Sequence, residues 1–147
     1  MKTIYFEIVF SLIFVISSVS CNLQKEISKD QLPKWALGPF ERPNDVNPII
    51  SPDSTTVFDC PMQGKLMKWE ESDAFNPAAT VKDGKIVVLY RAEDNSAQGI
   101  GKRTSRIGHA ESVDGITMKR RSTPVLFPNE DIAKDIEWTG GCEDPRV

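Results

Sequence analysis

The chain has 147 residues, of which 39% are hydrophobic and 27% are charged, and its formal net charge at pH 7 is −3. This length suffices for one domain with a hydrophobic core, but not for a large barrel or a complete propeller of many blades. The small negative charge provides no general attraction to nucleic acid or to an anionic membrane surface, so we expect no nucleic-acid partner.

Residues 1–20 are predicted to be a signal peptide. An almost wholly apolar run covers residues 8–16, and small residues then lead up to Cys21. The run is too short for a comfortable transmembrane helix, and small residues before a cysteine are typical of a bacterial lipoprotein signal. We therefore expect an exported lipoprotein, periplasmic or on the cell surface, attached to the membrane only by a lipid on Cys21. Cleavage near Ser20 and an uncleaved anchor are the alternatives.

Residues 21–34 are polar and charged, which predicts a tether ahead of a domain that begins at residue 35. Two further cysteines, Cys60 and Cys142, and a single histidine, His109, make up the remaining soft metal ligands. They show no C-x-x-C spacing, so we expect no metal site and no bound cofactor. An exported compartment permits a disulfide between the two cysteines, and two separate, half-buried thiols are the alternative.

Along the chain, the proline-rich residues 35–63 predict irregular, extended structure, with short strands at 47–50 and 56–58. The clearest element follows. Residues 78–82 and 85–91 are rich in β-branched and apolar side chains and flank Asp83-Gly84. This dipeptide favours the two-residue turn of a β-hairpin, so the pattern predicts two antiparallel strands.

A second Asp-Gly pair, at residues 114–115, separates a predicted strand at 105–112 from another at 116–118. Residues 124–127 are a further strand candidate, and the acidic residues 129–136 are predicted to form one helical turn. Short strands separated by turn signals indicate an all-β meander.

The densest chemical cluster is Glu143-Asp144-Pro145-Arg146. In extended chain, neighbouring side chains point to opposite faces, so we expect Asp144 to share a face with Arg146 and not with Glu143. The proline is expected to hold Asp144 in extended geometry, and the nearby guanidinium to lower the pKa of its carboxyl group. A purely structural Asp–Arg pair is the alternative interpretation.

Three more polar residues stand at the ends or entrances of predicted strands. Asn76 precedes Pro77, Arg91 ends an apolar strand, and Arg106 begins the next one. An amide can bind sugar hydroxyls because it both donates and accepts hydrogen bonds, and strand ends are where loop-borne sites are built. Turn chemistry for the asparagine and simple solvation for the arginines are the alternatives.

Taken in order, residues 75–78, 89–92, 105–115 and 141–146 resemble glycoside hydrolase family 130, and the resemblance covers roughly residues 35–147. The resemblance implies a five-bladed β-propeller that acts on β-mannosides as a phosphorylase or a mannosidase. This chain would form the N-terminal part, roughly the first two blades.

The resemblance also implies roles for single residues. Asp144 would be the catalytic proton donor, passing its proton through a mannose hydroxyl to the glycosidic oxygen. Asn76, Arg91 and Arg106 would line the mannose subsite of a β-mannoside oligosaccharide. The inverting reaction needs a second reactant on the opposite face of the sugar, either water in hydrolysis or inorganic phosphate, as co-substrate, in phosphorolysis.

A five-bladed propeller needs roughly twenty strands, at about four per blade, which exceeds what this sequence supplies. We therefore expect a truncated enzyme, and no turnover from residues 22–147 alone. The alternative of another class is a non-catalytic, glycan-binding surface lipoprotein, and a third possibility is a non-functional remnant that does not fold.

Overall fold

The computed structural model describes residues 31–36, 38, 40 and 42–147. The chain divides into two units, Met1–Arg42 and Pro43–Val147. The described part of the first unit contains no strand, and in a turn there the amide of Ala36 donates to the carbonyl of Pro33 at 2.9 Å. The signal peptide and the lipidation of Cys21 lie outside the described residues and stay predictions. Within the described residues, no helix has the length and apolar character needed to cross a membrane.

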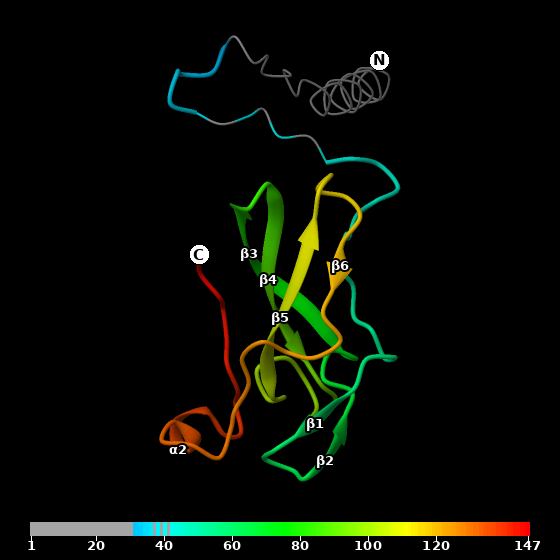
Figure 1. Ribbon diagram of the computed structural model, residues 1–147, viewed down its shortest axis with the longest axis vertical. Helices are drawn as coiled ribbons and strands as arrows, with labels where there is room; N and C mark the ends of the chain where they lie inside the picture. Colours follow the sequence, from blue (N-terminus) through cyan, green and yellow to red (C-terminus); the bar gives the residue numbers. More distant parts are fainter. Residues whose placement is uncertain (1–30, 37, 39, 41) are drawn as a thin grey trace, which may run out of the picture. The chain divides into compact units, whose positions relative to one another are not determined.

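The second unit is all-β, as predicted, apart from one short helix. It contains a two-stranded and a four-stranded sheet, both antiparallel, and the larger sheet is a simple meander (Figure 1). In chain order the elements are β1 (Phe58–Cys60), β2 (Lys65–Met67), β3 (Asp73–Lys82), β4 (Lys85–Glu93), β5 (Ser105–Ser112), β6 (Lys119–Arg120) and α2 (Lys134–Glu137).

The predicted hairpin around Asp83-Gly84 is confirmed. Lys82 pairs with Lys85, and both turn residues have positive φ, 51° and 74°, as a primed two-residue turn requires. The first strand, however, begins at Asp73, five residues before the expected start. It continues through Asn76-Pro77 because β3 is an edge strand with a bulge at that point, and both features tolerate proline.

The second predicted hairpin is correct in its first strand and wrong in its second. β5 covers the predicted residues, but β6 is Lys119–Arg120 and not residues 116–118. The carboxylate of Asp114 accepts hydrogen bonds from the amides of Ile116 and Thr117, each at 2.8 Å. These donors are therefore occupied by a local turn, and pairing resumes only beyond it.

Three short segments also differ from expectation. Residues 47–50 form no strand, and the strand expected at 56–58 begins at Phe58 instead. Residues 124–127 make only an isolated bridge between Leu126 and Ile107. The helical turn predicted within 129–136 is present as α2, which extends one residue further, to Glu137.

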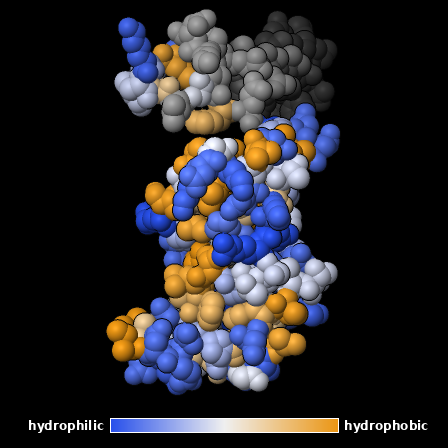
Figure 2. All heavy atoms as spheres, viewed as in Figure 1, coloured by the Kyte–Doolittle hydropathy of each residue, from blue (hydrophilic) through white to orange (hydrophobic). Residues whose placement is uncertain are grey.

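The core lies between the two sheets. Within it, Tyr90 of β4 stacks against Trp69, with ring centroids 6.4 Å apart. The Tyr90 ring lies directly on Gly108 of β5, where a β-carbon would come within 2.3 Å of the ring. Elsewhere, apolar residues reach the surface at the α2 end, where Ile132 and Ile136 are exposed (Figure 2). The buried cluster consists of Phe58, Cys60, Trp69, Val88, Tyr90, Ala92 and Ala110.

Candidate active site

A bulge in β3 presents the first residue of the candidate site. Phe75 pairs with Arg91 and Ala78 with Leu89, so β3 has one extra residue between these two pairs. Within the bulge Asn76 has a φ of 46°, a left-handed conformation that asparagine tolerates better than most residues. Bulges re-aim side chains, and here the exposed amide of Asn76 turns toward the C-terminal segment.

Arg91, near the end of β4, supplies the cation. Its side chain is 7% exposed, and its guanidinium lies over the ring of Phe75, with Cζ 4.8 Å from the centroid. Its Nη2 donates to Glu93 at 2.8 Å and to Glu143 at 2.7 Å, and its Nε donates to the hydroxyl of Ser105 at 2.9 Å. A guanidinium held by so many acceptors has one orientation, and this orientation directs Nη1 toward Asp144, 3.5 Å away.

Asp144 arrives on a segment that is attached to β5. The amide of Ser105 donates to the carbonyl of Gly140 at 2.8 Å, and the amide of Cys142 donates to the carbonyl of Ser105 at 2.9 Å. Two residues later the Asp144 carboxylate accepts a hydrogen bond from Nδ2 of Asn76 at 2.7 Å, through the same oxygen that faces Arg91. Asn76, Arg91 and Asp144, separate in sequence, therefore form one cluster.

The expected geometry of the acidic motif is wrong. Asp144 is not extended but has a left-handed φ of 44°. This turn lets both Glu143 and Asp144 reach Arg91, whereas strict alternation would have separated them. The cation in direct contact with Asp144 is Arg91, while the charge of Arg146 also lowers the pKa of the Asp144 carboxyl group, as expected. Left-handed backbone at a non-glycine residue is strained and often marks a functional position, and here Asn76 and Asp144 show it face to face.

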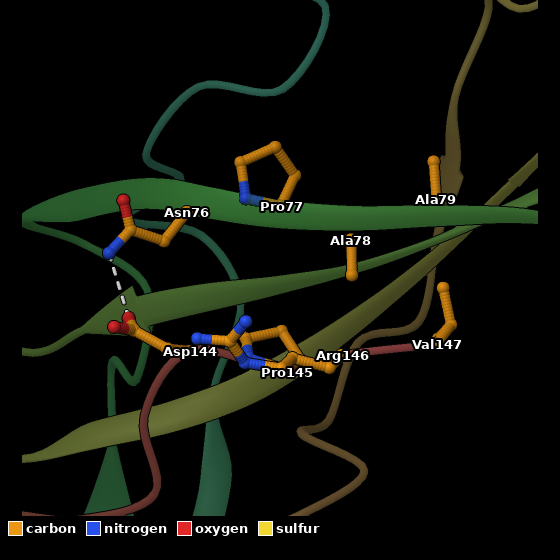
Figure 3. A pocket seen from close by; sticks show the side chains of 8 residues that line it. All are labelled: Asn76, Pro77, Ala78, Ala79, Asp144, Pro145, Arg146 and Val147. Atoms are coloured by element: carbon orange, nitrogen blue, oxygen red, sulfur yellow. Dashed lines mark hydrogen bonds between the residues drawn. The ribbon is translucent and has the colours of Figure 1, made fainter.

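A pocket of about 560 Å³ opens beside this pair, between β3 and the C-terminal segment (Figure 3). One wall consists of Asn76, Pro77, Ala78 and Ala79, and the other of Asp144, Pro145, Arg146 and Val147. The Asp144 carboxylate and the Asn76 amide stand together at one end. The pocket offers the carboxylate of Asp144, the amide of Asn76 and the guanidinium of Arg146, and groups of these kinds bind and orient sugar hydroxyls.

The protonation of Asp144 follows from its neighbours. The hydrogen bond from Asn76, and then the hydrogen bond and charge of Arg91, lower the pKa of the carboxyl group below its ordinary value, and the partial desolvation opposes them. Without a ligand Asp144 is therefore a carboxylate at neutral pH. A role as proton donor at neutral pH would require this pKa to be raised, for instance by a ligand that replaces the Asn76 amide or covers the carboxyl group from water.

Arg106 lies away from this cluster. Ala92 is its register partner, and it is fully buried on the core face, paired with Asp94 at 2.7 Å. Arg91 pairs with Ile107, so the β5 residues on its face are the odd-numbered ones, beginning with Ser105. The assignment of Arg106 to the mannose subsite stays a prediction, and its surroundings in the structure are those of a buried ion pair.

Sequence reasoning did not select Glu93, Ser105 or Glu143 as members of the site. Glu93 and Ser105 are fully buried and directly opposite each other in the register of β4 and β5. Alternation along β4 puts Arg91 and Glu93 on one face, but the Asp83-Gly84 turn fixes only the pairing of β3 with β4, so the partner of Glu93 on β5 is visible only in the folded chain. Among the described residues, no three His, Cys, Asp or Glu side chains are grouped as metal ligands, and Cys60 and Cys142 are free thiols.

Comparison with known proteins agrees with this geometry. Residues 40–147 match the model of a family described as β-1,4-mannooligosaccharide phosphorylase, glycoside hydrolase family 130. The chain belongs to glycoside hydrolase family 130. A curated relative, the 1,2-β-oligomannan phosphorylase of Thermoanaerobacter sp. (strain X514), is 36% identical over 81 residues, which are 54% of this chain and 26% of that protein.

Solved structures are more similar. A structure described as a glycosidase from Bacteroides thetaiotaomicron VPI-5482 is 61% identical, with a TM-score of 0.74 over 79% of this chain and 33% of that one. A second has 61% identity and a TM-score of 0.75 over 79% of this chain and 32% of the other. It is described with the statement that the GH130 family of mannoside phosphorylases contains glycoside hydrolases that target β-1,2 mannosidic linkages in Candida mannan. The chain thus spans about a quarter to a third of these relatives.

Proposed function

We propose that this chain carries the proton donor and part of the sugar subsite of an enzyme that cleaves β-mannosides. The observation that carries the proposal is the convergence of Asn76 and Asp144 at one open pocket, with the Arg91 guanidinium in contact with the Asp144 carboxylate. Asp144 is the acid, while Asn76 and Arg91 hold mannose hydroxyls. The four-stranded antiparallel meander supports the further proposal that this sheet is one blade of a five-bladed propeller, because propeller blades have this architecture.

The lowered pKa of Asp144 constrains the mechanism. A mannose that enters the pocket would take the Asn76 amide as its own partner and shield the carboxylate from water. Both changes raise the pKa of Asp144 and allow it to hold a proton, which it passes through a mannose hydroxyl to the glycosidic oxygen. Arg91 then stabilises the carboxylate that remains.

Hydrolysis of β-1,2-mannosidic linkages is the reaction that the comparisons favour. The structure described with hydrolases for such linkages is 61% identical to this chain, whereas the curated phosphorylase is 36% identical. In this reaction water attacks the sugar from the face opposite Asp144 and inverts the anomeric centre. Phosphorolysis differs only in the second reactant, which would be inorganic phosphate.

Binding and product analysis test the proposal separately. In the 15N-labelled chain, β-1,2-mannobiose should shift the signals of Asn76, Arg91 and Asp144, and Asn76→Gly should weaken binding. When the gene product isolated from its source organism is incubated with β-1,2-mannobiose, free mannose should form without added phosphate. Mannose 1-phosphate that forms only with phosphate would contradict hydrolysis. Binding without any cleavage, unaffected by Asp144→Asn, would favour a non-catalytic glycan-binding protein.

A further inference from the structure

Ser105 connects the two halves of the candidate site. Its backbone lies in a parallel bridge with Gly141 and makes a hydrogen bond on each side of it, to Gly140 at 2.8 Å and from Cys142 at 2.9 Å. The approach is so close that a β-carbon on Gly141 would come within 2.0 Å of the Ser105 carbonyl oxygen. The segment that delivers Asp144 is thus attached to β5 at this one residue.

The hydroxyl of Ser105 belongs to a second, buried set of contacts. It accepts a hydrogen bond from Nε of Arg91 at 2.9 Å and donates to Oε1 of Glu93 at 3.1 Å. The same Glu93 oxygen accepts from Nη2 of Arg91 at 2.8 Å, which closes a triangle of three side chains. Ser105 and Glu93 are fully buried, and Arg91 is nearly so, so water does not compete for these bonds.

We propose that Ser105 is a positioning residue, which sets the placement of the Arg91 guanidinium relative to the Asp144 carboxylate. Its backbone fixes the segment that bears Asp144, and its hydroxyl fixes the Nε edge of Arg91. Both partners of the Arg91–Asp144 contact are therefore held in place by the same residue of β5. The inference rests on the proposed roles of Asp144 and Arg91.

The other oxygen of Glu93 indicates how Arg91 would move if the Ser105 hydroxyl were removed. Oε2 of Glu93 is buried and has no hydrogen-bond partner among the described residues. Without the Ser105 hydroxyl, Arg91 can rotate to bind both oxygens of Glu93, because a bidentate pair satisfies this orphan acceptor. That rotation carries the guanidinium away from Asp144. Ser105 thus holds Arg91 in the orientation that serves the acid.

The test is the Ser105→Ala variant of the full chain, which keeps both backbone hydrogen bonds and removes only the hydroxyl. Titration of the Asp144 side-chain carbon by NMR should show its pKa shifted to higher pH than in the wild type. Ser112→Ala is the matched control. This serine, also on β5, binds Asp114 at 2.7 Å and lies on the opposite face, so its loss should leave the Asp144 titration unchanged.

An unchanged Asp144 pKa in a folded Ser105→Ala variant would overturn the inference and leave Ser105 with a structural role only. If Ser105→Ala fails to fold, a measurement on the wild type still tests the inference. The Nε proton of Arg91 should exchange with water much more slowly than that of the exposed Arg121, and equal exchange would also overturn the inference. Neither experiment uses a sugar. A failure of the proposed function, seen as absent mannoside binding, is therefore distinguishable from a failure of the inference about Ser105.

Discussion

Among single residues, Asn76 has the greatest influence on the acid, because its hydrogen bond is the largest contribution to the lowered pKa of Asp144. Asn76→Gly is the informative change, since glycine accepts a φ of 46° without strain while alanine does not. We expect the Asp144 pKa to rise in this variant, as measured by NMR titration. As a control, Asp83→Gly introduces a glycine at a similar φ of 51° in the turn that follows β3, and it should leave the Asp144 pKa unchanged.

Cys142 is a second side chain with a clear expectation. Burial, together with the charge and hydrogen bond of Glu137, raises the pKa of its thiol from 9.0 to about 11. Because only the thiolate reacts, the folded protein should be alkylated by iodoacetamide at pH 8 much more slowly than the denatured protein. Mass mapping of the modified cysteine identifies the site, with Cys142→Ser as the control. Equal rates in the two states would contradict this prediction.

The raised pKa of Cys142 also links stability to pH. A folded-state pKa above the unfolded value means that the folded protein favours the protonated thiol. Its contribution is complete below about pH 9 and declines as pH rises toward the folded value near 11. The wild type should therefore lose more stability than Cys142→Ser between these pH values, as urea unfolding at each pH would show.

At the level of strands, the contact between β4 and β5 depends on a missing side chain. A β-carbon at Gly108 would lie 2.3 Å from the Tyr90 ring, and neither strand can move away because each is paired on both sides. Gly108→Ala should therefore lower the free energy of unfolding by about 1–3 kcal/mol, the usual cost of overpacking. Urea denaturation measures this change. Gly140→Ala meets no atom within 4 Å and should be nearly neutral.

The strands were predictable where local chemistry decides. Asp83-Gly84 determines the first hairpin, because few other dipeptides adopt two successive positive φ values. The return strand after Asp114 was placed too early, because the bonds from one carboxylate to two following amides are not visible as a hydrophobic pattern. Alternation along β5 separates Arg106 from Ser105. Which of the two shares a face with Arg91 depends on the register between β4 and β5, which no single strand reveals.

The site was predictable in its residue types and not in its geometry. Asn76, Arg91 and Asp144 were selected from sequence, and the structure brings them together. Their contact depends on two left-handed residues, one in a bulge and one before a proline, and strand alternation predicts neither. The buried partners of Arg91 were missed because buried carboxylates and hydroxyls differ from surface ones only in the folded chain.

Across the whole of residues 43–147, a buried polar residue joins the larger sheet to the segment that precedes β1, in addition to the apolar core. Glu70 is fully buried and accepts hydrogen bonds from Tyr90 of β4 at 2.7 Å, Arg120 of β6 at 3.0 Å and Thr56 at 2.8 Å. Its backbone carbonyl accepts from Asp53 at 2.8 Å. One carboxylate thus ties the larger sheet to the segment that precedes β1, and it supplies the acceptor that the buried Tyr90 hydroxyl needs.

Removal of Glu70 should therefore destabilise this unit as a whole. In Glu70→Ala the buried hydroxyl of Tyr90 loses its acceptor, while Arg120 keeps the Ser51 carbonyl and its proximity to Asp53. Leaving a buried donor unsatisfied costs about 1–3 kcal/mol. Unfolding in urea, followed by Trp fluorescence and by far-ultraviolet circular dichroism, should show one transition at a lower midpoint for both signals. Glu111→Ala removes an exposed partner of Lys85 and should hardly change the midpoint. If the fluorescence of Glu70→Ala changed well before the dichroism, this unit would not unfold as one, and Glu70 would not be a link on which the whole unit depends.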